Sequence, residues 1–391
     1  MTLLFEILFW VSLGWLLYVF IVYPALIGLL AKLRPRPVRR SENYTPEVCF
    51  VMAAYNEEEV IGRRLQSYLD LEYPREKLSF SIGSDASADR TDEIVRDFQQ
   101  KDPTISLQRF NRVGKTEIVY TLAGETESEI IIFCDADIEL KQDVVKTIVS
   151  CFADEEVGGV VVRVVYRDKD KNTGNVGETT YLDMENGLRR NESLWHSTVS
   201  PTGQCFAVRN GYYSPLTDYG MSDDLNLAIT IPLNGKRVWY EPTAVIEEIN
   251  DRNLWSECKR RLRMGQQSMA TFLRYEGTRW PWRSKTGFQI WSHKVLRNLA
   301  AVPALLLLIS SLALFAEGGI YKVVGVLGLV WAGFSLVGLL LEVLRLKLPI
   351  IGYPLYFTLM IANLAVGSFR AIFSGKGLAM WNSPRIKHQL D

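Results

Sequence analysis

The stretch Glu129-Ile-Ile-Ile-Phe-Cys-Asp135-Ala136-Asp137 joins an apolar run to two carboxylates at its end. A short apolar run bounded by charged residues is typical of an interior strand in a sheet that is covered on both faces. Ligands of open α/β sheets bind beyond the carboxyl ends of such strands. Hard divalent cations prefer carboxylate oxygens and substrate phosphates as ligands. The pattern therefore favours a metal at Asp135 and Asp137, although, taken alone, a solvated strand end or a turn explains both residues as well.

Composition indicates a membrane portion beside a soluble one, because 48% of the 391 residues are hydrophobic and the formal net charge is zero. Charged residues are absent from four segments, at 7–31, 300–316, 323–341 and 348–369. About 20 apolar residues are enough to cross a bilayer. We therefore expect four membrane segments. The first lacks the basic start and the cleavage pattern of a signal peptide, so we expect it to be a retained anchor.

The charges beside these segments predict an orientation. Five basic residues closely follow the first segment: Lys32, Arg34, Arg36, Arg39 and Arg40. Basic residues favour the cytoplasmic side, so the next domain should be cytoplasmic in a multi-pass protein of the cell membrane. The five cysteines lie far apart, without zinc-ligand or redox spacing, which agrees with a reducing compartment. Four spans would put the basic carboxyl-terminal tail outside, a conflict that a re-entrant segment would remove.

Between residues 48 and 134, runs that favour strands alternate with runs that favour helices. Strands are expected at 48–53, 78–83, 105–110 and 130–134, and helices at 60–69, 91–100 and 115–123. This alternation implies an α/β fold with a mostly parallel sheet. A further strand is expected at 158–166, followed by a helix that carries residues 181–192.

Short polar motifs follow the strands in a fixed order: Tyr55-Asn56-Glu57, Asp85 with Ser87 and Asp89, Gly114-Lys115, and Asp135-Ala136-Asp137. In order and spacing they resemble the nucleotide-sugar site of family 2 glycosyltransferases, over roughly residues 47–298. The resemblance implies a GT-A fold, which is a Rossmann-like α/β domain, here with transmembrane helices and amphipathic interface helices. The flanking apolar segments look like those of the membrane-bound branch that makes chitin oligosaccharides, hyaluronan and cellulose.

The resemblance also assigns roles to single residues. Tyr55 and Asp85 would hold the uracil of a UDP-sugar, and Lys115 would contact the nucleotide. Asp135 and Asp137 would bind the diphosphate together with Mg²⁺ or Mn²⁺. The whole set implied to bind the donor is Tyr55, Glu57, Asp85, Lys115, Asp135, Arg260 and Arg263.

A second acidic cluster, Ser222-Asp223-Asp224, matches the family's Thr-Glu-Asp element. By this match Asp224 would be the general base that removes the proton of the acceptor hydroxyl. Asp223 would contact the acceptor. The alternative is a pair of residues that caps the helix expected at 225–229.

Other acceptor contacts are implied for Gly203 and Gln204, in a segment where glycine would let a sugar ring approach the backbone. Asp183 and Glu185 are further candidates for acceptor contacts, and a solvated helix face explains them almost as well. His196 lies outside any recognised motif. It is more simply explained as a packed residue than as a base.

Residues 252–297 contain 11 basic residues, two acidic ones and four tryptophans. Basic amphipathic helices with aromatic anchors bind membrane lipids, and the adjacent spans argue against nucleic acid as the partner. Arg260-Arg261-Leu262-Arg263-Met264 stands where the family has Gln/Arg-x-x-Arg-Trp, which implies diphosphate contacts for Arg260 and Arg263. Met264 replaces the tryptophan that holds the acceptor sugar.

These observations imply an inverting, metal-dependent hexosyltransferase that uses UDP-GlcNAc or UDP-glucose. It would extend a membrane-held glycan into a β-linked product, which an export partner could carry onward. The alternative is transfer of one sugar to a membrane lipid. The expected divisions are an anchor (1–34), a cytoplasmic GT-A domain (35–250), interface helices (251–298), transmembrane helices (299–375) and a tail (376–391).

Two other classes of protein share parts of this pattern. An apolar strand that ends in Asp-x-Asp also resembles haloacid-dehalogenase-type phosphatases, but there the strand comes early and the lysine follows it, whereas here Lys115 precedes Asp135. A membrane scaffold that merely binds a nucleotide is the third reading. It is disfavoured because every acidic motif is present.

Overall fold

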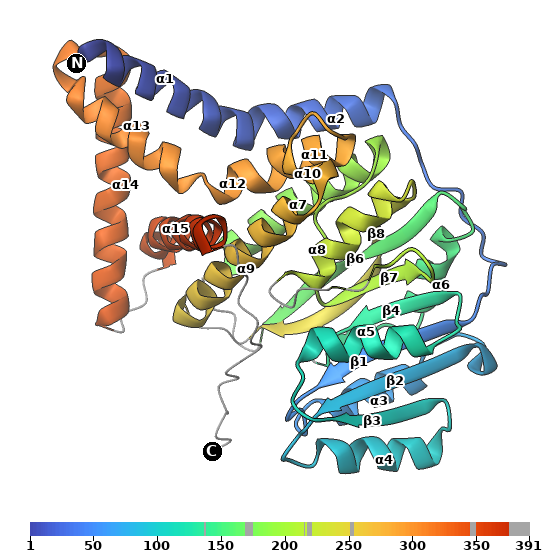
Figure 1. Cartoon of the computed structure of the whole chain (residues 1–391). Helices are drawn as coiled ribbons and strands as arrows, with labels where there is room; N and C mark the ends of the chain where they lie inside the picture. The colour runs from blue at the N-terminus through green and yellow to red at the C-terminus, as the bar shows by residue number, and fades with distance from the viewer. Residues whose placement is uncertain are drawn as a thin grey trace.

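The computed structural model describes residues 1–136, 138–168, 175–214, 216, 221–250, 254–344 and 349–374. An α/β domain forms one side of the molecule and long apolar helices form the other (Figure 1). Asp137 and the tail at 376–391, both named in the sequence analysis, lie outside the described residues.

The described strands form one eight-stranded sheet in the order β3-β2-β1-β4-β7-β6-β8-β5. Their bounds are β1 Val48–Ala54, β2 Leu78–Asp85, β3 Ile105–Phe110, β4 Ile130–Cys134, β5 Ile138–Leu140, β6 Val157–Asp168, β7 Cys205–Arg209 and β8 Arg237–Asn250. Strands β3, β2, β1 and β4 pair in parallel, as the sequence predicted. Strand β7 runs antiparallel to both of its neighbours, β4 and β6.

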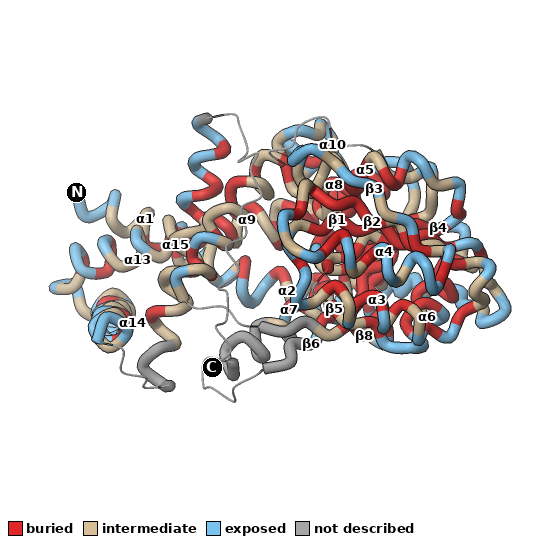
Figure 2. The backbone as a smooth tube through the Cα atoms, turned by 90° about the horizontal axis from the view of Figure 1, so that it is seen from below, coloured by how far each residue is buried: buried red, intermediate tan, exposed pale blue. Residues whose placement is uncertain are grey.

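Helices cover both faces of this sheet. In the α/β domain they are α3 Ile61–Leu69, α4 Thr91–Lys101, α5 Lys115–Glu125, α6 Val144–Cys151, α7 Asn175–Trp195 and α8 Asp223–Leu233. Strand β1 is buried along its whole length because alternate side chains enter the cores on its two faces. Figure 2 shows these strands as the buried centre of the domain. The elements expected between residues 48 and 134 are confirmed within two residues at each end.

The remaining helices are α1 Thr2–Leu17, α2 Tyr23–Leu33, α9 Leu254–Arg274, α10 Glu276–Arg279, α11 Lys285–Ile290, α12 Leu296–Asn298, α13 Ala301–Ala313, α14 Gly319–Val343 and α15 Pro349–Ser374. π-Helices at Tyr18–Val22 and Trp291–Val295 connect α1 to α2 and α11 to α12. Three-residue 3₁₀ helices occur at Arg75–Lys77 and Phe315–Glu317.

Among the described residues, three helical stretches are long and apolar enough to cross a membrane: Thr2–Leu33, Gly319–Val343 and Tyr353–Phe373. The segment expected at 300–316 corresponds to α13, which meets this criterion only together with residues 285–298, across a bend of 56°. Figures 1 and 2 show that α1, α14 and α15 point in different directions. The multi-pass topology and the cytoplasmic orientation stay predictions.

Helix α9, expected among the membrane-surface helices, packs tightly on α15. A Cβ atom added to Gly265 would lie 2.4 Å from the carbonyl oxygen of Leu364, and one added to Gly367 would lie 2.1 Å from that of Leu262. Such a close approach of two backbones is open only to glycine. One side of α9 is therefore covered by protein.

The basic linker after the first apolar helix is fastened to the α/β domain. Arg36 pairs with Glu156 at 2.7 Å, and Arg40 pairs with the buried carboxylate of Glu241. The backbone N–H of Arg39 donates to Asp154 at 3.1 Å. Acidic side chains of the domain thus neutralise two of the five basic residues on which the predicted orientation rests.

Candidate active site

Four charged side chains meet where α5, α8 and strand β4 come together. The ammonium of Lys115, at the start of α5, lies 2.7 Å from Asp135 Oδ1 and 3.7 Å from Asp223 Oδ2. Asp135 directly follows β4, and Asp223 and Asp224 begin α8. A pocket at this point is lined by Lys115, Val119, Tyr120, Phe133, Cys134, Gly203, Phe206, Asp223, Asp224 and Leu227. The structure thus brings together residues that the sequence assigned separately to donor, acceptor and base.

The positive charge of Lys115 is stabilised by its acidic neighbours. Burial alone would lower its pKa, but the carboxylates of Asp135 and Asp223 outweigh burial and raise it. Lys115 therefore stays cationic and offsets two carboxylates that would otherwise repel each other. An ammonium held in this way also attracts a phosphate oxygen.

Asp224 lies in the first turn of α8 and is half-buried. Its Oδ1 accepts hydrogen bonds from the Ser222 hydroxyl and from the backbone N–H of Leu225, the latter at 2.8 Å. A Cβ atom added to Gly203 would lie 3.2 Å from Asp224 Oδ2, so a side chain there would press on the carboxylate. Burial and the neighbouring charge of Asp223 raise the pKa of Asp224. A carboxylate with a raised pKa beside a pocket has the properties of a general base.

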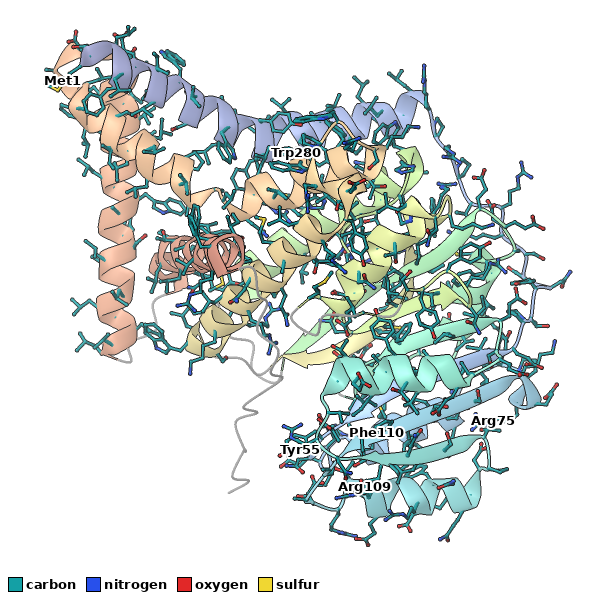
Figure 3. All side chains as sticks on the ribbon, viewed as in Figure 1. Met1, Tyr55, Arg75, Arg109, Phe110 and Trp280 are labelled. Atoms are coloured by element: carbon teal, nitrogen blue, oxygen red, sulfur yellow. The ribbon has the colours of Figure 1, made fainter. Side chains whose placement is uncertain are left out.

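A second group of residues lies at the ends of β1 and β2. Asp85 is fully buried and pairs with the guanidinium of Arg112 at 2.5 Å. The backbone N–H of Gly114 lies 3.2 Å from both carboxylate oxygens of Asp85. The Arg112 guanidinium lies 3.5 Å from the centre of the Tyr55 ring. Figure 3 shows Tyr55 at this tip of the domain, close to Arg109 and Phe110.

Sequence reasoning missed Arg112. Its backbone adopts a positive φ of 53°, in the short turn between β3 and α5 that also contains Gly114 at φ 92°. Such a turn brings the side chain back over Tyr55 and Asp85. The only indication in the sequence was that Arg112 is a basic residue three positions before Lys115, which was implied to contact the nucleotide.

Glu57 and Gln204, two further residues predicted for the site, form hydrogen bonds through their backbones. Glu57 is buried, and its N–H donates to Thr91 Oγ1 at 2.7 Å. The carbonyl of Gln204 accepts a hydrogen bond from the N–H of Asp135 at 2.9 Å. This bond joins the expected acceptor segment directly to the expected diphosphate ligand.

Arg260, Arg263 and Met264 all lie on α9. Arg260 donates two hydrogen bonds of 2.6 Å to Glu257 of the same helix and lies 3.5 Å from the sulfur of Met264. Met264 is 37% exposed. The structure therefore gives Arg260 a partner within its own helix, and donor binding by the α9 residues stays a prediction.

The metal expected at Asp135 and Asp137 has only one of its two ligands within the described residues. In that part of the chain, no three His, Cys, Asp or Glu side chains come close enough to hold a metal ion. Asp135 and Asp223 nevertheless direct carboxylate oxygens at one cationic centre, the Lys115 ammonium. Oxygen ligands of this kind fit a hard cation that also binds a diphosphate.

Three other expectations concern residues away from this pocket. Glu185 is buried against Lys294 and Arg297, at 2.9 and 2.8 Å, so its carboxylate is occupied by protein cations instead of facing an acceptor. Asp183 is exposed. Burial, reinforced by nearby cations, lowers the pKa of His196 to about 4. His196 is therefore a neutral, packed residue, with Nε2 3.3 Å from Thr286 Oγ1.

Comparison with known proteins gives relatives along most of the chain. The family model for glycosyl transferase family 2 matches residues 49–216. A beta-monoglucosyldiacylglycerol synthase from Synechocystis sp. is 27% identical over 275 residues, which cover 67% of this chain and 57% of that protein. A poly-beta-1,6-N-acetyl-D-glucosamine synthase from Staphylococcus aureus is 26% identical over 254 residues, covering 61% of this chain and 60% of that protein. The chain thus matches less than two thirds of the length of these relatives.

A likeness in fold extends further than the family model. The solved structure of a mannosyltransferase from Pyrobaculum calidifontis, in complex with GDP-Man and Mn²⁺, has a TM-score of 0.71 to this chain at 22% sequence identity. The likeness covers 94% of this chain and all of that one, including the apolar helices. Residues 49–216 of this chain therefore form a family 2 glycosyltransferase domain with a GT-A fold.

Proposed function

We propose that this protein transfers a hexose from a UDP-sugar, of the UDP-GlcNAc or UDP-glucose type, to a hydroxyl of a membrane-held glycan, forming a β-linkage. The observation that carries the proposal is that Lys115 and Asp224 line one pocket and that Asp135 pairs with Lys115 at 2.7 Å. A cation for the diphosphate and a carboxylate base for the acceptor are the two groups that inverting sugar transfer requires.

In the proposed reaction Asp224 accepts the proton of the acceptor hydroxyl. The freed oxygen forms a bond to the anomeric carbon as the bond from that carbon to the diphosphate breaks, and the electron pair leaves with UDP. Lys115 offsets the charge that grows on the diphosphate, and Arg263 is the proposed second cation. Mg²⁺ or Mn²⁺ held at Asp135 and Asp137 would add further positive charge there when bound.

Transfer of a single sugar to a membrane lipid is the second candidate. Two observations favour it: Met264 stands in place of the tryptophan expected to hold a growing chain, and one relative is named for a glycosylated diacylglycerol. In both cases membrane lipids surround the apolar helices, and an export partner is needed only if the product is a long glycan.

The deciding experiment measures nucleoside diphosphate release by the detergent-purified protein. A panel of UDP- and GDP-sugars is supplied with Mg²⁺, Mn²⁺ or EDTA, with lipid or oligosaccharide acceptors, and products are sized by mass spectrometry. We expect acceptor-dependent UDP release from one or two UDP-sugars, abolished by EDTA. Selective use of a GDP-sugar would refute the proposed donor, and hydrolysis of phosphate esters with no sugar transfer would refute the whole proposal.

The raised pKa of Asp224 predicts how the rate depends on pH. The base works only when deprotonated, so kcat should fall as the pH drops through a value above the ordinary 3.8. Since the charge of Asp223 contributes to the rise, Asp223→Asn should move this acid limb to lower pH. The check is a pH-rate profile of both proteins at saturating donor. If the acid limb of Asp223→Asn stays at the same pH or moves to higher pH, Asp224 is not the group that titrates in this limb.

Arg112→Ala should weaken nucleotide binding. The change leaves the buried carboxylate of Asp85 without its ion pair and removes the guanidinium from the Tyr55 ring. The loss of a hydrogen bond to a charged group predicts a Kd for UDP that is higher by about tenfold or more. Calorimetric titration with UDP and Mn²⁺ measures it.

Arg75→Ala is the matched control for this variant, because Arg75 also forms an ion pair and lies over an aromatic ring, but its partners are Asp102 and Tyr68 instead of Asp85 and Tyr55. Its Kd should stay close to that of the wild type. Tighter binding of UDP by Arg112→Ala would mean that Arg112 blocks the nucleobase position.

A further inference from the structure

A buried cluster of charged side chains lies between the α/β domain and the apolar helices. It contains Glu185 and Glu192 of α7, His293 and Lys294 of the π-helix Trp291–Val295, and Arg297 of α12, and is called the anchor cluster below. Both glutamates and the histidine are at most 3% exposed. Figure 1 shows α7, α11 and α12 side by side beneath α2.

His293 joins the two glutamates. Its Nδ1 lies 2.7 Å from Glu192 Oε1, and its Nε2 lies 3.2 Å from Glu185 Oε2. Lys294 and Arg297 complete the surroundings of Glu185, at 2.9 and 2.8 Å. The cations outweigh the cost of burial and hold the pKa of Glu185 well below its ordinary value. The cluster is thus charged and mutually paired.

The first apolar helix also reaches the cluster. The Tyr23 hydroxyl, at the start of α2, donates to Glu192 Oε1 at 2.7 Å. The two π-helices touch as well, because the Tyr18 hydroxyl lies 2.8 Å from Ser292 Oγ. π-Helical turns are rare and occur frequently at functional sites. Here both of them lie at the junction between the apolar helices and the α/β domain.

The anchor cluster holds the chain segment that leads into the pocket. Glu192 Oε2 accepts hydrogen bonds from Thr198 Oγ1 and from the backbone N–H of Val199, both at 3.2 Å. The Ser200 hydroxyl donates to Glu185 and accepts from Lys294, the latter at 2.6 Å. Three residues later comes Gly203, which lies against Asp224.

We propose that the anchor cluster positions residues 198–204 against Asp224, so that the junction with the apolar helices sets the acceptor side of the pocket. Glu185, Lys294 and Ser200 are then positioning residues for sugar transfer. They act through Gly203 and Gln204 and not by touching the substrate. This inference rests on the proposed function for its kinetic consequences, whereas its structural consequence is independent of any activity.

The sharpest variant is Ser200→Ala, because it removes the bonds from Glu185 and Lys294 to the segment and leaves the ion pairs of the cluster and the bonds of Glu192 in place. Lys294→Met removes the bond from Lys294 to Ser200 together with the ion pair between Lys294 and Glu185. Ser150→Ala and Lys77→Met are the controls. Ser150 is a buried serine of α6 whose hydroxyl donates to the carbonyl of Thr147 in its own helix. Lys77 is a lysine bound to Thr45, at the other side of the domain.

Two measurements on the full-length protein in detergent test the proposal. Hydrogen exchange of the peptide that spans 198–204 should be faster in Ser200→Ala and Lys294→Met than in their controls. Sugar transfer at saturating donor should fall about tenfold or more, while Kd for UDP stays within about twofold of the wild type. A merely structural role would lower thermal stability without this difference between kcat and donor affinity.

Unchanged exchange at 198–204 in Ser200→Ala would overturn the inference, as would an unchanged kcat despite faster exchange. A loss of UDP affinity as large as the loss of sugar transfer would also overturn it, because the defect would then extend beyond the acceptor side of the pocket. If the wild-type protein transfers no sugar from any donor, the proposed function fails, and the exchange measurement alone decides whether the cluster holds the segment.

Discussion

Asp224→Asn is expected to lower the rate of sugar transfer by about 10²–10⁴-fold, the usual contribution of a general base, while UDP binding stays close to that of the wild type. The amide keeps the shape of the side chain, and its oxygen can still accept from Ser222 and from the N–H of Leu225. It cannot take up the proton of the acceptor hydroxyl. Product formed per minute, measured by mass spectrometry beside a UDP titration, checks both halves of this expectation.

The competing explanation is that Asp223 and Asp224 only cap α8. The local bonds permit it, since the N–H of Asp224 donates to Asp223 Oδ1 at 3.0 Å. Loss of a cap costs about 1 kcal/mol of stability and leaves kcat of the folded enzyme intact. Asp143→Asn, at the residue that precedes α6, is the matched control. If Asp224→Asn and Asp143→Asn transfer sugar equally fast, Asp224 is not the base.

The sequence predicted the first half of the domain well for a physical reason. Between residues 48 and 134, each strand is a short apolar run and each helix has its own periodic pattern, so the elements can be read one by one. Parallel strands also end at one edge of the sheet. Asp85 and Asp135 could therefore be assigned to strand ends before the structure was known.

The second half was predicted less well because its elements depend on contacts distant in sequence. Strand β8 contains Glu241, a residue that disfavours a buried strand until Arg40, Trp239 and Thr243 surround it. The β6–β8 ladder also shifts register after Glu241. Neither the burial of Glu241 nor the shift in register produces a periodic pattern that could be recognised within one segment of the sequence.

The same limit explains the contacts around the candidate site that the sequence did not reveal. Glu185 looked like one acid on a helix face, and its three partners His293, Lys294 and Arg297 lie more than a hundred positions away in the sequence. Helix α9 looked like a surface helix because of its charge, and its contact with α15 depends on Gly265 meeting Leu364. Arg112 lies on a turn whose positive φ no periodicity reveals.

Glu185→Gln should be among the most destabilising single substitutions in the chain. It keeps the volume of the side chain and removes only the negative charge, so Lys294 and Arg297 lose their common counter-charge in a buried place, and His293 loses a carboxylate partner. Breaking a buried ion pair on one side costs about 3–5 kcal/mol. We expect Glu185→Gln to lower the free energy of unfolding by about 3 kcal/mol, at the lower end of this range. The reason is that Lys294 and Arg297 keep 17% and 11% of their side-chain surface exposed, so water can relieve part of the cost.

The effect should also depend on pH in a defined direction. Because the pKa of Glu185 is depressed in the folded protein, its contribution is fully present above the ordinary value of 4.5 and is lost as the pH falls toward the folded value. The difference in thermal stability between wild type and Glu185→Gln should therefore be largest near neutral pH and shrink below pH 4.5. Thermal unfolding in detergent across this pH range measures it.

Glu72→Gln is the control for this prediction, because Glu72 forms an ion pair with Lys146 on the surface, where both side chains are 56% exposed. Exposed pairs contribute about 0–1 kcal/mol, so this variant should unfold close to the wild type. Equal melting temperatures for the two variants at neutral pH would show that the anchor cluster adds no net stability. A difference that grows on acidification would show that Glu185 is not held as a carboxylate in the folded protein.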